Sequence, residues 1–270
     1  MLPLSFFDVR EWISRYIRMI RHKEDFSLKI LIVRHGEPDY SIDSLTERGW
    51  QEVEYLAERL AQIPTAAYYV SPLGRARDTS KPTLEKVGRT AEVLPWLREF
   101  EAPIDKPDIP DRKSCTWDWL PGDWTPEEKY FHHDQWWQSP RMMAGDVKKE
   151  YDWVIAGLDD LLANHGYQRE GYYYRAVEPN NDTIVLFCHF ALECVLLSHL
   201  LNISPMALWH GTCAAPSSVT TVVTEERREG IAYWRMLAFG DTSHLYHHGE
   251  EPSFMARFCE CYKNEEERHD

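Results

Sequence analysis

The feature that most constrains this 270-residue chain is an apolar run over residues 28–33 that ends in Arg34, His35 and Gly36. Five of the six residues in the run are aliphatic. Such a run is typical of a strand that is buried on both faces, as in a parallel sheet covered by helices. Ligands bind at the carboxyl ends of the strands in open α/β sheets, and a glycine there permits a tight turn. The run therefore predicts an α/β fold in which Arg34 and His35 face a pocket.

The side chains at the end of this run indicate chemistry at phosphorus. An imidazole is partly unprotonated near neutral pH and is then a good nucleophile. A neighbouring guanidinium can hold a phosphate with two parallel N–H donors. The same short motif also fits a surface histidine in a turn, so the rest of the chain has to decide between the two interpretations.

A predicted strand followed closely by a polar or charged side chain occurs three more times. The pairs are residues 66–70 before Arg75, residues 91–94 before Glu99, and residues 183–188 before His189. Because helices alternate with these strands, we expect parallel pairing through right-handed crossovers. Three of the strand ends then bring cations and imidazoles to one edge of the sheet, and the fourth brings a carboxylate.

The remaining periodic segments complete a single domain over residues 27–248. Apolar spacing predicts helices near residues 45–60, 75–87, 146–164 and 191–201, and an antiparallel hairpin from strands at 219–224 and 231–237. The polar, tyrosine-rich residues 165–182 are interpreted as a connection, and His199 as a packing residue inside its helix. The predicted architecture is a three-layer α/β/α domain with a mostly parallel central sheet and an antiparallel edge.

Residues 101–145 interrupt this alternation and are rich in proline and tryptophan. They predict an insertion folded over the edge of the sheet, with a short helix near residues 126–137. The insertion is interpreted either as a lid that shapes the substrate pocket or as a satellite core, and both roles are compatible.

The two ends of the chain differ from the domain between them. Residues 1–26 place apolar side chains at helical spacing among several arginines, which predicts a basic amphipathic helix. We favour packing of this helix on its own domain over a membrane-surface or dimerisation role, although a homodimer stays open. Residues 249–270 are predicted to form a charged tail.

Composition limits the partners and the compartment. The formal net charge of −14 argues against nucleic acid, whereas a small phosphate ester needs only a local group of cations. The six cysteines show no spacing typical of a small disulfide-bonded domain, which favours reduced thiols in the cytoplasm. No apolar run approaches the ~20 residues of a membrane-spanning helix. Cys259-x-Cys261 lacks the second pair that a zinc site requires, so we expect no metal.

Taken together, the motifs resemble the histidine phosphatase superfamily, the phosphoglycerate-mutase-like group. The matching segments, in chain order, are Arg34-His35-Gly36-Glu37, Leu45-Thr46-x-x-Gly49, Ser71-Pro72-Leu73-x-Arg75-Ala76-x-x-Thr79, Leu97-Arg98-Glu99, the strand ending in His189, and Asp241-Thr242-Ser243-His244-Leu245. The series extends over residues 28–245, and an ordered series is far more specific than a single tripeptide.

The resemblance implies a role for each matching side chain. His35 would attack phosphorus and become a phosphohistidine, while Arg34, Arg75 and His189 would hold the phosphoryl oxygens. Glu99 would protonate the leaving alcohol, and water would then hydrolyse the intermediate without a cofactor. Phosphoryl transfer depends mainly on positioning and charge stabilisation, which this set of side chains can supply.

A second carboxylate competes for the role of proton donor. Glu101 lies two residues beyond Glu99, and on an extended segment both side chains would face the same side. A carboxyl group can donate a proton to an alkoxide only if its pKa is raised, as a shielded pocket would do.

Three functions remain in competition at this point. The first is a metal-independent phosphatase acting on a small phosphorylated metabolite, and the second is a phosphoglycerate-type mutase. Mutases of that group resemble one another in an Arg-His-Gly-Glu-Ser-x-Trp-Asn motif, whereas Pro38-Asp39-Tyr40 follows here and favours hydrolysis. The third is a non-catalytic phosphate-binding or scaffold protein with the same fold, which the presence of all the core residues disfavours.

Overall fold

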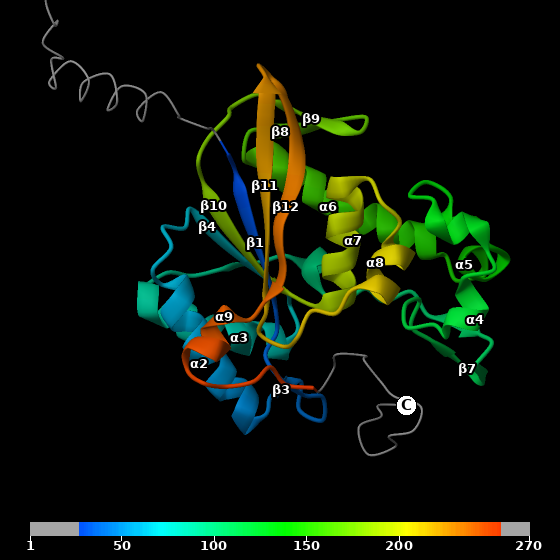
Figure 1. Ribbon diagram of the computed structural model, residues 1–270, viewed down its shortest axis with the longest axis horizontal. Helices are drawn as coiled ribbons and strands as arrows, with labels where there is room; N and C mark the ends of the chain where they lie inside the picture. The colour runs from blue at the N-terminus through cyan, green and yellow to red at the C-terminus, as the bar shows by residue number, and fades with distance from the viewer. Residues whose placement is uncertain (1–26, 255–270) are drawn as a thin grey trace, which may run out of the picture.

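The computed structural model describes residues 27–254, so the predicted helix over residues 1–26 and the end of the predicted tail lie outside the described residues. An eight-stranded sheet with the order β5-β4-β10-β1-β11-β12-β9-β8 forms the centre of the domain (Figure 1). Its strands are β1 (Lys29–Arg34), β4 (Ala67–Val70), β5 (Glu92–Val93), β8 (Tyr167–Glu170), β9 (Tyr173–Ala176), β10 (Thr183–Cys188), β11 (Val219–Arg228) and β12 (Ile231–Asp241). Two small sheets pair β2 (Pro38–Asp39) with β3 (Ser44–Leu45) and β6 (Ile104–Lys106) with β7 (Ile109–Ser114).

The register between β1 and β10 determines where the two strand-end histidines lie. These strands are parallel neighbours, and Arg34 pairs with Cys188 at their carboxyl ends. β4 and β5 extend the parallel pairing on the far side of β10. His35 and His189 each follow the last residue of their strand, so the sheet delivers both to one edge.

The antiparallel side of the sheet is wider than predicted. β11 and β12 form the expected hairpin, but residues 167–176, interpreted above as a connection, add the hairpin β8–β9 beyond it. Their aromatic side chains explain the difference, because Tyr167 and Tyr174 are buried and pack against Trp234.

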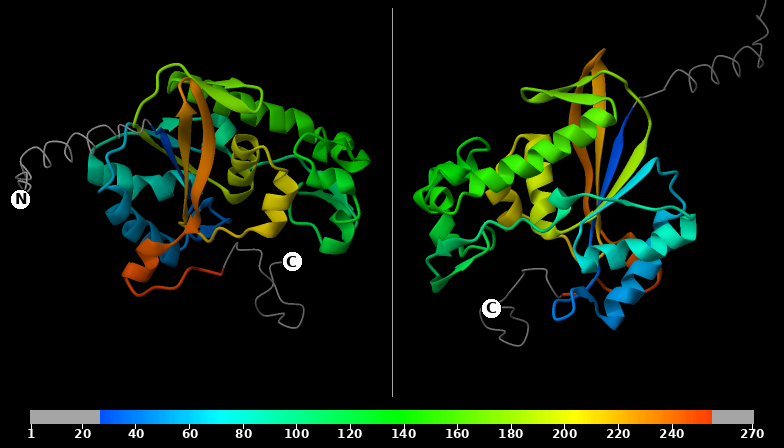
Figure 2. Two further views of the ribbon diagram at one scale, coloured as in Figure 1. Left: turned by 45° about the horizontal axis from the view of Figure 1, so that its top comes forward. Right: turned by 180° about the vertical axis from the view of Figure 1, so that it is seen from behind.

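Alternate residues of the central strands face two different helical layers. Ile30 and Ile32 of β1 join the core under one layer, whereas Leu31 and Val33 join the core under the other. The first layer holds α6 (Val147–Asn164), α7 (Phe190–Leu201) and α8 (Pro205–Gly211), and the second holds α2 (Glu47–Leu60) and α3 (Gly74–Val87), as Figure 2 shows from two sides. The predicted α/β fold with helices on both faces is therefore confirmed.

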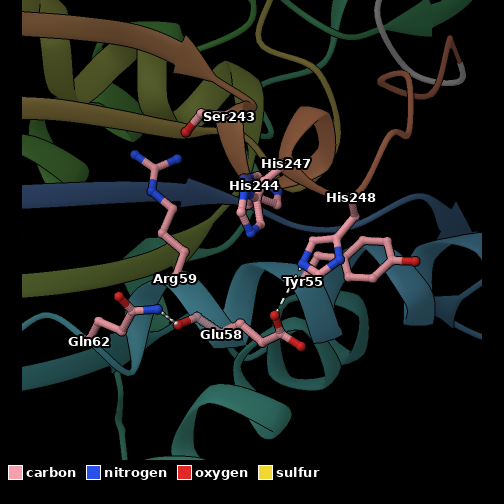
Figure 3. Close-up of a pocket in the computed structure, with 8 residues that line it drawn as sticks. All are labelled: Tyr55, Glu58, Arg59, Gln62, Ser243, His244, His247 and His248. Atoms are coloured by element: carbon pink, nitrogen blue, oxygen red, sulfur yellow. Dashed lines mark hydrogen bonds and ion pairs between the residues drawn. The ribbon is translucent and has the colours of Figure 1, made fainter.

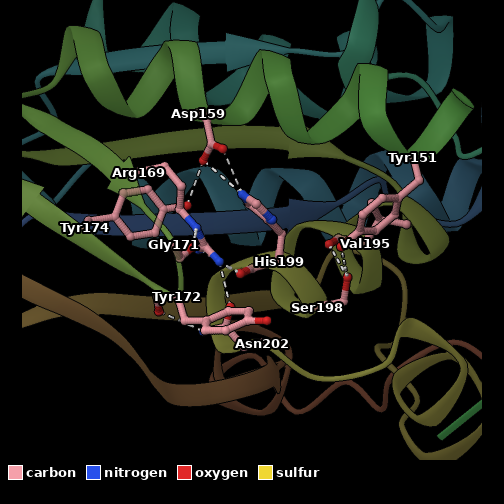
Figure 4. Close-up of polar contacts among 10 residues, drawn as sticks. All are labelled: Tyr151, Asp159, Arg169, Gly171, Tyr172, Tyr174, Val195, Ser198, His199 and Asn202. Atoms are coloured by element: carbon pink, nitrogen blue, oxygen red, sulfur yellow. Dashed lines mark hydrogen bonds and ion pairs between the residues drawn. The ribbon is translucent and has the colours of Figure 1, made fainter. Parts of the chain in front are cut away.

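A polar network joins α6, α7 and the β8–β9 hairpin at the edge of the first layer (Figure 4). The Nε2 atom of His199 lies 3.0 Å from a carboxylate oxygen of Asp159. Arg169 donates to the carbonyl oxygen of His199 at 3.1 Å and to Oδ1 of Asn202 at 2.6 Å. His199 is thus a partnered side chain that connects packed elements, as its position in the sequence predicted.

The insertion over residues 101–145 has more, and shorter, helical segments than predicted. In place of one helix near 126–137 it contains α4 (Pro121–Trp124), two 3₁₀ turns, η2 (Glu128–Phe131) and η3 (Trp136–Gln138), and α5 (Pro140–Ala144). Pro121 and Pro140 start new helices because proline fits the first helical turn but not the interior. Trp136 is fully buried and packs edge-on against Trp209 of α8, with ring centroids 5.6 Å apart. These contacts support the satellite-core interpretation, and the lid stays a prediction.

The chain returns to the carboxyl edge of the sheet near its end. After the short helix α9 (Ser243–His247), the carbonyl oxygen of Glu251 accepts a hydrogen bond from Arg48 at 2.6 Å. Ser253 is buried and donates to the carboxylate of Glu37, two residues after His35. The first residues of the predicted tail therefore lie against the domain.

None of the helices within residues 27–254 is long and apolar enough to cross a lipid bilayer.

The motif glycine at position 49 supplies our first prediction. Gly49 lies in the first turn of α2, where Thr46 caps the helix by accepting from the Gly49 N–H at 3.0 Å. A Cβ atom at this position would lie 2.3 Å from the carbonyl oxygen of Glu37. We expect Gly49→Ala to lower the free energy of unfolding by about 1–3 kcal/mol, as overpacking does.

Chemical denaturation measures this change, and Gly122→Ala is the matched control. A Cβ on Gly122, also in the first turn of a helix, would meet no atom within 4 Å. The control should be neutral or slightly stabilising, because alanine is the better helix former. Equal effects of the two substitutions would show that the close approach of Glu37 to α2 is not a packing constraint.

Candidate active site

Two imidazoles face each other at the carboxyl edge of the sheet. The ring centroids of His35 and His189 are 5.2 Å apart, with the ring planes inclined by 57°. Their residues are 2% and 0% exposed, respectively. The two histidines are separated by more than half of the chain in sequence, and the parallel pairing of β1 with β10 brings them together.

The hydrogen bonding of His35 determines which ring nitrogen is available for chemistry. Its Nδ1 atom lies 2.8 Å from the carbonyl oxygen of Gly36. A carbonyl can only accept, so Nδ1 carries the proton and Nε2 has the free lone pair. Burial lowers the pKa of His35 well below its usual value of 6.5, and the positive charges of Arg34 and Arg75 lower it further. At neutral pH the ring is therefore uncharged and nucleophilic at Nε2.

His189 is oriented by a different hydrogen bond. Its Nε2 atom lies 2.8 Å from Oγ of Ser71, in the turn after β4. Its Nδ1 atom is buried and has no hydrogen-bond partner among residues 27–254. Burial lowers the pKa of His189 well below 6.5, followed by the charges of His35, Arg75 and Arg34. A buried ring nitrogen without a partner beside a cluster of cations is suited to contact an oxyanion.

Contacts with neighbouring groups hold the two arginine side chains in place. Arg34 is buried, donates to the carbonyl oxygen of Ala214, and places its guanidinium carbon 5.5 Å from the centre of the Phe190 ring. Arg75 donates from Nη1 to Oδ1 of Asp43 at 2.7 Å. The Nε atom of Arg75 is buried and has no partner in the described part of the chain.

Glu99 is the carboxylate that the fold places with these cations. Its Oε1 atom accepts from the N–H of Phe100 at 2.9 Å and from that of Leu192, in the first turn of α7, at 3.0 Å. Burial raises the pKa of Glu99, against the opposing effects of these two N–H groups and of Arg75 and Arg34. The pKa of Glu99 is thus raised, as expected for a carboxyl group that donates a proton to an alkoxide.

Glu101 lies in a different environment, so the expectation that the two carboxylates face the same side is wrong. Its side chain is 65% exposed and pairs with Arg98 at 3.1 Å. Arg98 also binds Glu150 of α6 at 2.6 Å, which holds this ion pair on the outer surface. Glu99 turns instead toward the N-terminus of α7, which the sequence near Glu99 does not reveal.

Two supporting residues were not identified from the sequence. Asp43, in the turn between β2 and β3, fixes Arg75 and also accepts from the N–H of Gly74 at 2.7 Å. Glu193 is buried on α7 with a pKa raised to about 7 by burial, which the charge of Arg34 opposes. In the sequence, the only sign of this contact is that residue 74 is a glycine. A Cβ atom at that position would lie 2.1 Å from the carbonyl oxygen of Asp43, so a larger residue would not fit.

The arrangement is suited to an oxyanion with several negatively charged oxygens. Two guanidinium groups and two imidazoles converge on one edge of the sheet, and a protonatable carboxyl lies with them. Within residues 27–254, no group of three or more histidine, cysteine, aspartate or glutamate side chains is arranged to hold a metal ion.

Solved structures provide a comparison for the fold. A mycobacterial hydrolase matches at a TM-score of 0.52 and 18% identity, over 80% of this chain and 99% of its own. A phosphoserine phosphatase variant from Entamoeba histolytica, solved with phosphoserine, matches at 0.51 and 21% identity, over 81% and 99%. A mycobacterial glucosyl-3-phosphoglycerate phosphatase, solved with inorganic phosphate, matches at 0.50 and 21% identity, over 80% and 98%. At such identities the likeness shows the fold.

The sequence itself carries the family assignment. No curated protein matches the sequence. A sequence model of the histidine phosphatase superfamily (branch 1), however, matches residues 30–165, about half of the chain. The matched region contains Arg34, His35, Arg75 and Glu99, and the parallel strand β10 adds His189 beside them. The chain belongs to the histidine phosphatase superfamily.

Proposed function

We propose that this protein is a phosphatase that hydrolyses a small phosphomonoester through a phosphohistidine on His35. The observation that carries the proposal is the pairing of two uncharged, buried imidazoles 5.2 Å apart, with the charges of Arg34 and Arg75 acting on both. Phosphoryl transfer requires an in-line nucleophile and cations around the equatorial oxygens. His35 supplies the first, and its neighbours supply the second.

In the first step, Nε2 of His35 attacks phosphorus. An N–P bond forms while the bond from phosphorus to the ester oxygen breaks, and Arg34, Arg75 and His189 bind the phosphoryl oxygens. The proton stays on Nδ1 and is donated in a hydrogen bond to the Gly36 carbonyl oxygen, which stabilises the positive charge that develops on the ring. Glu99 gives its proton to the departing alkoxide, so the leaving group departs as a neutral alcohol.

In the second step, water resolves the intermediate. The Glu99 carboxylate takes a proton from water, whose oxygen attacks phosphorus while the N–P bond breaks. Inorganic phosphate leaves, and both His35 and Glu99 return to their starting protonation states. One carboxyl group can act as acid and then as base because its pKa is raised toward the operating pH.

A small phosphorylated metabolite in the cytoplasm is the substrate class we propose. The net charge of −14 opposes long polyanions but not one phosphate bound in a local cradle. Tyr40 lies over Arg75, with the guanidinium carbon 5.5 Å from its ring centre, and its ring is 60% exposed, so it is available to contact the rest of a small substrate. The four described cysteines are all free thiols, in keeping with a reducing compartment.

Loss of the nucleophile should abolish turnover. We expect His35→Ala to reduce phosphate release from 4-nitrophenyl phosphate, measured in the presence of EDTA, by at least about a thousandfold. His132→Ala is the control, because His132 lies in the insertion with a half-exposed side chain. An inactive unmodified chain would favour a non-catalytic protein, and isomerisation of 3-phosphoglycerate without phosphate release would favour a mutase.

The two neighbouring glutamates should differ in their dependence on the leaving group. Glu99→Gln should slow hydrolysis of a simple alkyl phosphate by about a hundredfold or more, the usual contribution of a general acid. It should have little effect on kcat/KM for 4-nitrophenyl phosphate, because this parameter reports only the first step and the 4-nitrophenolate leaving group needs no proton. Glu101→Gln is the matched control and should be close to wild type with both substrates. The reverse pattern would assign the acid to Glu101.

The pH dependence of kcat/KM should reflect the protonation of Glu99. Glu99 must be protonated and its pKa is raised, so kcat/KM for an alkyl phosphate should fall as pH rises through that raised value. His35 must be uncharged and its pKa is lowered, so activity should persist below pH 6.5. The ratio of wild-type to Glu99→Gln rates cancels the ionisation of the substrate and should decline toward one with rising pH. A ratio independent of pH would argue against Glu99 as the acid.

A further inference from the structure

The turn between β2 and β3 lies directly against the first turn of α3. Ser44, at the start of β3, donates to Oδ2 of Asp78 at 2.6 Å. The backbones approach even more closely one residue earlier, because a Cβ atom on Gly74 would lie 2.1 Å from the carbonyl oxygen of Asp43. Arg75 is the next residue of the helix, so the contact between the turn and the helix determines where its side chain begins.

The carboxylate of Asp43 uses both of its oxygens in this contact. Oδ1 accepts from Nη1 of Arg75 at 2.7 Å, and Oδ2 accepts from the backbone N–H of Gly74 at 2.7 Å. The residue has a left-handed backbone conformation with φ of 48°, which aspartate adopts more readily than most residues. Asp43 therefore ties the guanidinium of Arg75 to the start of the helix that carries it.

The same turn also covers one face of this guanidinium. The ring centre of Tyr40 lies 5.5 Å from the guanidinium carbon of Arg75, within the range of a cation–π contact. The side chain of Arg75 is 12% exposed, whereas that of Asp43 is 44% exposed. An ion pair with a partner so accessible to water contributes little to stability. Its main effect is therefore on the orientation of the arginine.

We propose that Asp43 is a positioning residue, which holds the Arg75 guanidinium in the orientation that binds the phosphoryl oxygens in the transition state. This proposal rests on the proposed function, in which Arg75 binds the group that is transferred. A free arginine side chain has many rotamers, and ordering it before the substrate arrives removes that cost from the reaction. Cations that are fixed in advance stabilise developing charge most effectively. Asp43 thus contributes to the rate without contacting the substrate.

A matched control exists outside the candidate active site. Asp241 accepts from Nη2 of Arg59 at 2.7 Å and from the backbone N–H of Ser243, at the start of α9, at 2.7 Å. Arg59 and Ser243 line a pocket between α2 and α9 and have no role in the proposed reaction (Figure 3). Asp241→Asn therefore removes the same kind of contact as Asp43→Asn, but from an arginine that does not bind the phosphoryl group.

The first test follows the mobility of Arg75 by ¹⁵N relaxation of its Nε–H group, in the full chain without substrate. Asp43→Asn should lower the order parameter of this group, because an amide has one oxygen and cannot accept both hydrogen bonds. Asparagine tolerates the left-handed φ at position 43, so the backbone should keep its conformation. Asp241→Asn should leave the Arg75 signal unchanged.

The second test measures kcat/KM. Asp43→Asn should lower it by about tenfold or more for 4-nitrophenyl phosphate and for an alkyl phosphate alike, because Arg75 acts on the phosphoryl group that both share. In an Arg75→Ala background, the same substitution should change kcat/KM by less than about twofold, a coupling that a general loss of stability would not produce. Gly74→Ala is a second variant, whose Cβ would displace the turn from the helix, and it should give the same losses.

Three results would overturn the proposal. They are an Arg75 side chain that stays rigid in Asp43→Asn, a mobile one with unchanged kcat/KM, and a loss of activity that is the same with and without Arg75. An inactive unmodified chain would instead refute the proposed function. The relaxation measurement would then still decide whether Asp43 holds Arg75 in one orientation.

Discussion

The in-register parallel pairing of β1 with β10 is the constraint on which the rest of the site depends. Both strands are buried on two faces, and their alternating side chains fill the two cores of the domain. A slip of one residue in either strand would exchange those two sets, which makes the register strongly specified. The last pair in register, Arg34 with Cys188, therefore fixes the positions of the residues that follow the two strands. The geometry between His35 and His189 therefore follows from the hydrophobic packing of the two cores.

Burial then determines the charge states at that edge. Removing imidazoles from water disfavours their charged form, and two nearby guanidiniums have the same effect, so both histidines are uncharged. The same burial acts in the opposite direction on Glu99 and raises its pKa. One physical cause, burial, thus lowers the pKa of the two imidazoles and raises that of the carboxyl group. Among residues 27–254, the buried Nδ1 atom of His189 and the buried Nε atom of Arg75 have no hydrogen-bond partner, and an oxyanion is suited to contact both.

The sequence was sufficient to predict a structural feature where a local pattern and the chemistry of its residues agree. It was insufficient where the feature depends on a contact between residues far apart in the chain. The strands that end in His35 and His189 were predictable because continuous aliphatic runs stop at polar residues. The β8–β9 hairpin was not, because each of its short strands has only one buried tyrosine, among mostly polar and charged neighbours. The separation of Glu99 from Glu101 depends on the first turn of α7, more than 90 residues away, and on Arg98. No local feature of either glutamate contains that information.

Several motif residues that lie outside the candidate active site hold in place the loops that form it. Thr46 and Gly49 bring the start of α2 against Glu37, and Thr46 also donates to the Glu37 carboxylate at 2.8 Å. Near the other end of the chain, His244 reaches Ser217, which binds the backbone of His35. The backbone around His35 is therefore held both by the start of α2, which follows closely in sequence, and by Ser217, which contacts His244 of the last helix, α9.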